Sequence, residues 1–150
     1  MSLGNIFDIA GSGMSAQSVR LNTTASNLAN ADVPAASEAE AYRARYPLFA
    51  TVQQQLISEM SGGAGGEAGA GAGAGAGVSV KGIIESDAPM QPRYEPAHPL
   101  ANDEGYVFYP NVNVVEEMTN MISASRSFQS NVEVMNATKT MMQRVLTLGQ

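Results

Sequence analysis

The side chains that could carry out chemistry are few and widely separated in this chain. His98 is the single histidine, and it lies between two prolines without a serine, cysteine or carboxylate at a catalytic spacing. The pairs Asp103–Glu104 and Glu116–Glu117 offer acid–base groups, but adjacent residues on one loop or helix point apart. No cysteine is present, so neither a disulfide nor a thiolate metal site can form. The sequence therefore predicts no catalytic, cofactor-binding or metal site, and we do not expect an enzyme.

The glycine-rich stretches do not fit a phosphate-binding loop either. The GSG triplet at 11–13 follows no predicted strand, and the tract GGAGGEAGAGAGAGAG at 62–77 lacks the lysine of a P-loop. The net charge is −6 and the basic residues are mostly scattered singly, whereas nucleic-acid binding needs a concentrated basic face. No window reaches the roughly 18–20 apolar residues of a membrane span. Nucleic acid is thus excluded as a partner, and so is direct membrane insertion.

Apolar residues at heptad spacing run through the first 30 residues. This spacing is typical of a helix that packs along other helices. The stripe predicts a helix from about residue 3 to residue 30, with Ser2 as its N-cap and Pro34 beyond its end. Its many glycine, threonine, serine and asparagine residues give it weak helix propensity, so it needs packing partners. The members of the stripe are Phe7, Ala10, Met14, Leu21 and Leu28.

A second stripe predicts a helix over residues 114–147. Asn113 with Glu116 three residues later fits a capping box, and Gly149 supplies a stop. The methionine-rich stripe suits contact with several non-identical neighbours, because methionine adapts its shape. Its members are Val114, Met118, Met121, Phe128, Val132 and Met135, and after a slip of one position Thr138, Met141, Val145 and Leu148.

The residues between the helices are predicted to be extended. Residues 42–52 are expected to form a strand paired with 78–85, with the Gly/Ala tract 62–77 as a flexible loop at the hairpin tip. Four prolines predict an extended, solvent-lying arm over 86–99, and residues 105–109 could form one more short strand.

Together these segments predict an α+β fold. Two long terminal helices pair antiparallel as a coiled-coil-like unit, and a small central β-hairpin or extended region carries the Gly/Ala-rich loop. The expected divisions are 1–31 for the N-terminal helix, 32–110 for the central region and 111–150 for the C-terminal helix.

Both ends of the chain also resemble a known family. SGMSAQSVRLNTTASNLANADVP (12–34) and PNVNVVEEMTNMISASRSFQSN (110–131) are similar to the N- and C-terminal signatures of flagellar rod, hook and hook-associated axial proteins. Within that family, the proximal-rod basal-body members are most similar in the centre and at the end of the chain. The segments concerned are YRARYPLFA (42–50), IIESDAPMQPRYEPAHP (83–99), GYVFYPNVNVVEEM (105–118) and TLGQ (147–150). Residues 53–77 depart from the pattern, which indicates a loop expansion.

The resemblance implies a structural subunit of the proximal flagellar rod, the drive shaft that crosses the periplasm. Such a subunit polymerises through its terminal helices and transmits torque without an active site. The implied partners are other rod proteins, further copies of the chain, the flagellar type III export apparatus and the rings around the rod. Export is expected to proceed without a cleaved signal peptide, since the first basic residue is Arg20. The alternatives are a secreted effector or translocator of a type III-like system, and a cytoplasmic coiled-coil adaptor.

The candidate subunit-contact residues are apolar heptad positions and two asparagines. They are Phe7, Met14, Leu21, Asn27, Leu28, Met118, Met121, Phe128, Asn131, Val132, Met135 and Leu146. Four asparagines occupy motif positions, namely Asn22, Asn27, Asn30 and Asn131. Two interpretations of them remain open: hydrogen bonds across helix interfaces, or an ordinary solvated polar face.

Overall fold

The computed structural model describes residues 3–52 and 77–148. Its elements are α1 (Leu3–Asn30), β1 (Arg45–Val52), β2 (Gly77–Glu85), β3 (Gln91–Tyr94), β4 (Tyr106–Tyr109) and α3 (Val114–Leu148). The predicted α+β fold is confirmed. The expected N-cap Ser2, the stop residue Gly149 and the Gly/Ala loop before Gly77 lie outside the described residues.

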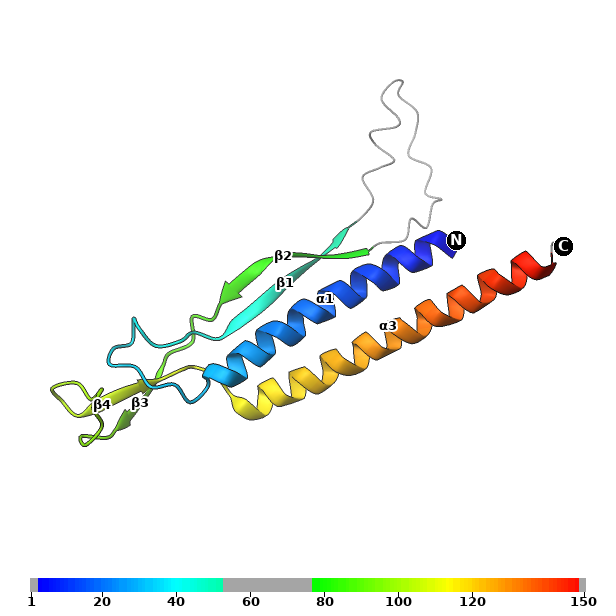
Figure 1. Cartoon of the computed structure of the whole chain (residues 1–150). Coiled ribbons are helices and arrows are strands. Elements are labelled where there is room, and N and C mark those ends of the chain that lie inside the picture. Colours follow the sequence, from blue (N-terminus) through cyan, green and yellow to red (C-terminus); the bar gives the residue numbers. More distant parts are fainter. Residues whose placement is uncertain (1–2, 53–76, 149–150) are drawn as a thin grey trace, which may run out of the picture.

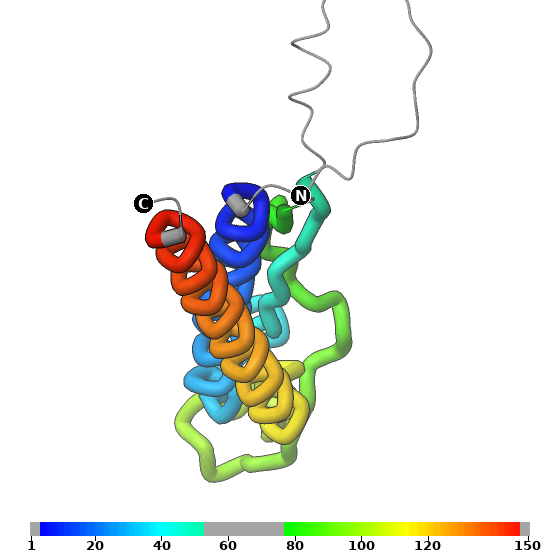
Figure 2. The backbone as a smooth tube through the Cα atoms, turned by 90° about the vertical axis from the view of Figure 1, so that its right-hand side faces the viewer, coloured from blue at the N-terminus to red at the C-terminus, as the bar shows by residue number. Residues whose placement is uncertain are grey.

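The molecule is elongated, with α1 as its middle layer. The β1–β2 pair lies along one side of α1 and α3 along the other (Figures 1 and 2). The start of α1 and the end of α3 lie at one end of the molecule, and the β3–β4 pair lies at the opposite end (Figure 1). The partners that the weak helix α1 needs are therefore present in the same chain. Neither described helix has a stretch apolar enough to cross a membrane.

The strands form two separate antiparallel pairs. β1 pairs with β2 from Arg45↔Glu85 to Val52↔Gly77, with a bulge after Leu48, which confirms the predicted pairing. β3 pairs with β4 from Gln91↔Tyr109 to Tyr94↔Tyr106. The second strand of this pair was expected. The first lies in the arm predicted over 86–99; it is extended and exposed, as predicted, but its pairing with β4 was not foreseen. Proline is tolerated in an edge strand of so small a sheet, so Pro92 does not prevent the pairing.

Small side chains form most of the buried interior. Ala31, Ala44 and Val112 make one core cluster, and the rings of Tyr42 and Tyr46 pack against it. Alanine, threonine and asparagine bury little apolar area but let the layers approach closely.

Side-chain caps define the start of α3. Asn113 Oδ1 accepts hydrogen bonds from the backbone N–H groups of Val115 (3.1 Å) and Glu116 (3.4 Å). These bonds satisfy donors that have no partner within the helix. The predicted helix start is therefore confirmed.

Candidate functional site

Asn27 joins three elements through one buried amide. Its Oδ1 accepts hydrogen bonds from the backbone N–H of Arg45 (2.9 Å) and the hydroxyl of Tyr42 (2.9 Å). Its Nδ2 donates to the backbone oxygen of Arg45 (2.9 Å) and to Glu117 Oε2 (3.2 Å). The side chain is 0% exposed, and the amide has a partner for each of its donors and two for its oxygen. Asn27 therefore fixes α1 against both β1 and the first turn of α3.

Glu117 is a buried carboxylate at the start of α3. It is 1% exposed, and Asn27 is its partner at Oε2. Its Oε1 atom meets no donor of the described residues in strict hydrogen-bond geometry. Tyr46 approaches the same carboxylate. Its own burial, followed by the charge and hydrogen bonding of Glu117, raises the pKa of the Tyr46 hydroxyl. The Glu117 carboxylate is thus buried away from water with few hydrogen-bond partners.

The contacts between α1 and α3 follow rows of residues seven apart. On α1, Arg20 Nη2 donates to Asn120 Oδ1 of α3 (2.9 Å). A Cβ atom on Gly13 would lie 2.9 Å from Asn131 Nδ2, so the helices are close at that point. The α1 row is Gly13, Arg20 and Asn27, and the buried α3 row contains Glu117, Ala124 and Thr138, with Asn131 between them. Both rows are small or polar. The α1 row, and the α3 row as far as Asn131, lie one position before the predicted apolar stripe, whereas Thr138 was itself a predicted member of that stripe.

Two further side chains hold segments together, one from the residues just before α3 and one from α1. Asn111 Oδ1 accepts from the N–H of Ala44 (2.8 Å), and its Nδ2 donates to the backbone oxygen of Ala88 (2.8 Å). Ser12 Oγ accepts from the N–H of Val78 in β2 (3.1 Å) and donates to the backbone oxygen of Ile9 (2.8 Å). The sequence interpretation missed these roles and that of Glu117. The only feature of the sequence that could have indicated these roles was a polar residue within a helical stripe or just before a helix cap.

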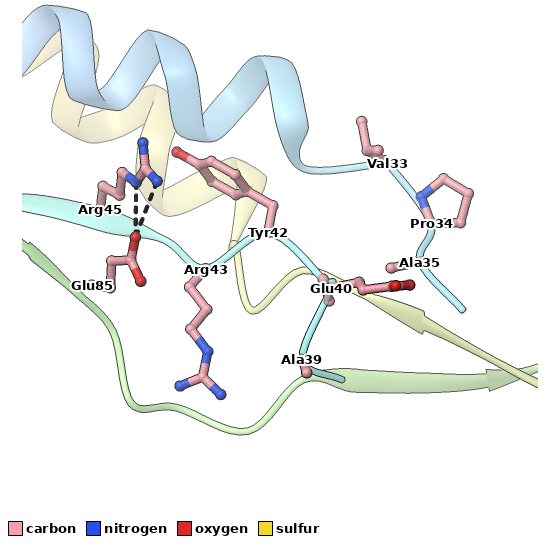
Figure 3. Close-up of a pocket in the computed structure, with 10 residues that line it drawn as sticks. Val33, Pro34, Ala35, Ala39, Glu40, Tyr42, Arg43, Arg45 and Glu85 are labelled. Carbon is pink, nitrogen blue, oxygen red and sulfur yellow. Dashed lines mark hydrogen bonds and ion pairs between the residues drawn. The ribbon is translucent and has the colours of Figure 1, made fainter. Parts of the chain in front are cut away.

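A cleft of about 410 Å³ opens beside the start of β1 (Figure 3). Its walls carry the exposed ion pair between Arg45 Nη2 and Glu85 Oε1 (3.0 Å), together with Tyr42, Arg43 and Glu40. The lining contains no serine, cysteine or histidine, so a nucleophile–base pair is not found there. Within the described ranges, no group of three or more histidine, cysteine, aspartate or glutamate side chains is placed to hold a metal ion.

The sequence of this chain is similar to those of known proteins. Residues 7–36 match the family described as flagella basal body rod protein, and residues 103–148 match the flagellar basal body rod FlgEFG protein C-terminal family. The flagellar basal-body rod protein FlgC of Escherichia coli O6:H1 is 51% identical over the whole of both chains. The chain belongs to the FlgC family of flagellar basal-body rod proteins. The FlgC proteins of Salmonella typhimurium and Bacillus subtilis are 49% and 35% identical, again over the whole of both chains. The resemblance found in the sequence is thereby confirmed.

The candidate contact residues all lie within the two segments that match rod families. The structure buries only Asn27 completely. Met118 and Leu146 are exposed at 51% and 69%. The others are half-buried: Phe7, Met14, Leu21, Leu28, Met121, Phe128, Asn131, Val132 and Met135. Their role between subunits stays a prediction.

The four motif asparagines divide between the two interpretations. Asn27 bonds to α3, and Asn131 lies against α1 at Gly13. Asn30 instead donates to the backbone oxygen of Ser26 within its own helix (2.8 Å), and Asn22 is exposed. One position is thus a cross-helix hydrogen bond, and another is a solvated polar side chain.

Proposed function

We propose that this chain is a structural subunit of the proximal rod of the bacterial flagellum, without catalytic activity. Residues 1–31 and 111–150 form its core domain, in which the terminal helices pair antiparallel as a coiled-coil-like unit. The central region 32–110 lies outside that core. Membership of the FlgC family supports the structural role, and α1 contacts that run against the direction of α3, from Asn27–Glu117 to Arg20–Asn120, support the pairing.

The observation that carries this proposal is that neighbouring rows of residues on the two helices differ in their contacts. The small and polar rows hold α1 and α3 together within the chain. The adjacent rows of larger apolar side chains, such as Leu21 on α1 and Met118 and Val132 on α3, stay half-buried or exposed. Apolar stripes left uncovered on a monomer are typical of interaction surfaces. These rows are available for contacts with neighbouring subunits.

The proposed partners are other rod proteins and further copies of this chain in the axial polymer, which the basal-body rings surround. We further propose that the subunit reaches the periplasm through the flagellar type III export apparatus without a cleaved signal peptide. The weak helix propensity of α1 supports this route, because such a segment unfolds at little cost when it is separated from its partners.

Two substitutions of half-buried residues in the predicted apolar stripes test the function. Leu21→Ala and Phe128→Ala should each reduce motility and recovery of the protein in detergent-extracted basal bodies, while its cellular level stays unchanged. The physical reason is that a lost apolar contact recurs at every subunit of the polymer. Asn22→Ala, an exposed position on the same helix, is the matched control. Recovery of the wild-type protein only from the cytosol would favour an adaptor, and recovery only from the culture supernatant would favour a secreted effector.

A further inference from the structure

Two surfaces at opposite ends of the molecule carry opposite charge. One is the helical tail, defined as residues 139–147 of α3, which extends toward the end where the chain begins and finishes (Figure 1). The other is the acidic tip, defined as residues 94–106, which connects β3 to β4 at the far end (Figure 1). Each surface combines exposed apolar side chains with charges of a single sign.

The helical tail is basic and has no cover from its own chain. Every side chain from Lys139 through Thr147 is exposed, including Val145 and Leu146 at 60% and 69%. The tail contains Lys139 and Arg144 and no acidic residue. Neither cation forms an ion pair with a described residue. The ion pair found among the described residues joins Arg45 and Glu85, which lie on β1 and β2.

The acidic tip has charges of the opposite sign. It carries Glu95, Asp103 and Glu104 and contains no lysine or arginine. Tyr94 is 65% exposed, and its ring meets the ring of Tyr106 edge to face at a centroid distance of 5.4 Å. Asn102 stabilises the turn: its Oδ1 accepts hydrogen bonds from the backbone N–H groups of Glu104 (3.1 Å) and Tyr106 (2.8 Å).

The cation nearest to the tip in sequence does not neutralise it. Arg93 lies over the ring of Tyr109, with its guanidinium carbon 4.5 Å from the ring centroid. Asp103 and Glu104 are exposed, whereas Glu95 is partly buried and accepts a hydrogen bond from the Tyr109 hydroxyl (3.4 Å). None of the three forms an ion pair with a described residue, and Leu100 adds an exposed apolar side chain to the same segment. An apolar surface rimmed by charges is typical of a protein–protein contact.

The two surfaces cannot meet within one molecule. α3 alone has 35 residues and so is about 50 Å long. We propose that the acidic tip of one copy docks on the helical tail of a second copy of this chain. This inference rests on the proposed function and names one of its contacts. Because the two surfaces differ, the contact is head-to-tail and leaves an open surface at each end for the next subunit.

Charge reversal at both surfaces tests the contact. The tail variant carries Lys139→Glu with Arg144→Glu, the tip variant carries Asp103→Lys with Glu104→Lys, and the swapped variant carries all four changes. Self-association of the full chain is measured by sedimentation velocity. The tail and tip variants should each associate about tenfold more weakly, because attraction becomes repulsion. The swapped variant should recover wild-type association, and added salt should weaken the wild-type contact.

Controls separate this contact from folding and from the function itself. Arg126→Glu reverses the charge of an exposed residue of α3 that lies before the tail, and it should leave association unchanged. Circular dichroism should show equal helix content in all variants. A swapped variant as weak as its parents overturns the inference, because the tail and tip then bind something other than each other. If the tail and tip variants still enter basal bodies normally, the inference fails while the proposed function stands. Absence of the wild-type chain from basal bodies refutes the proposed function.

Discussion

The amide of Asn27 acts on β1 as a neighbouring strand would. It bonds to both the N–H and the backbone oxygen of Arg45, the pattern by which strands recognise one another. At the same time it supplies the donor at Glu117 Oε2. A single side chain therefore supplies partners to backbone groups of a strand and to one oxygen of a buried carboxylate on a helix, and its removal takes these partners away.

Asn27→Ala should lower the free energy of unfolding by about 3 kcal/mol, since buried donors and acceptors lose their partners. Urea denaturation followed by circular dichroism measures this change. Asn22→Ala, which alters an exposed asparagine on the same helix, should change the free energy by less than about 0.5 kcal/mol. Equal effects of the two substitutions would contradict a special role for Asn27.

Tyr46 gives the protein a predictable response to alkaline pH. Because its pKa is raised in the folded chain, the unfolded chain releases this proton at lower pH than the folded one. The stabilisation is fully present below the ordinary tyrosine pKa of about 10 and is lost as pH rises through the folded value. Tyr46→Phe should therefore flatten the fall of Tm above about pH 10, as measured by thermal unfolding at a series of pH values. Tyr94→Phe at the exposed tip should retain the wild-type slope.

At the scale of elements, the spacing between α1 and α3 depends on a glycine. Gly13 faces the end of the Asn131 side chain at a distance that leaves little room for a larger residue, whereas Gly11 faces open space. Replacing each of these two glycines of one helix by the same larger residue therefore separates the effect of helix propensity on stability from the effect of packing.

Gly13→Leu should reduce the free energy of unfolding by about 1–3 kcal/mol, because the new side chain overpacks the helix contact. Gly11→Leu should instead raise it by up to about 1 kcal/mol, because leucine is the better helix former. Urea denaturation of the two variants measures the difference. Stabilisation by both substitutions would show that α1 and α3 are not closely packed at Gly13.

Much of this element arrangement could be predicted from periodicity. The heptad stripes located both helices, and β-branched and aromatic residues located β1, β2 and β4. The contact row within the chain was not predictable in the same way, because stripes are found from apolar residues and this row contains Gly13, Arg20 and Glu117. A glutamate in a first turn is normally solvated, so only tertiary contact reveals the burial of Glu117. β3 was missed because proline within a short segment normally argues against a strand.

At the scale of the whole molecule, the Gly/Ala tract is the part that the fold needs least. The β1–β2 register ends at Val52↔Gly77, and the entropy of closing a loop changes slowly with its length. Deleting residues 64–76 should therefore preserve motility in a swimming assay, because residues 53–63 still join the strands. The full-length chain expressed at the same level is the control. Loss of motility would show that the tract itself makes a necessary contact.

The position of α1 as the middle layer also sets the order in which the molecule can be completed. The first helix to leave the ribosome finds its partners far downstream: Arg20 bonds to a residue 100 positions later, and Asn27 to one 90 positions later. Contacts between such distant residues form slowly. β1 and β2, which cover the other face of α1, are made earlier. The face of α1 that meets α3 therefore stays uncovered until the final quarter of the chain has been made, and during that interval other factors can bind to it.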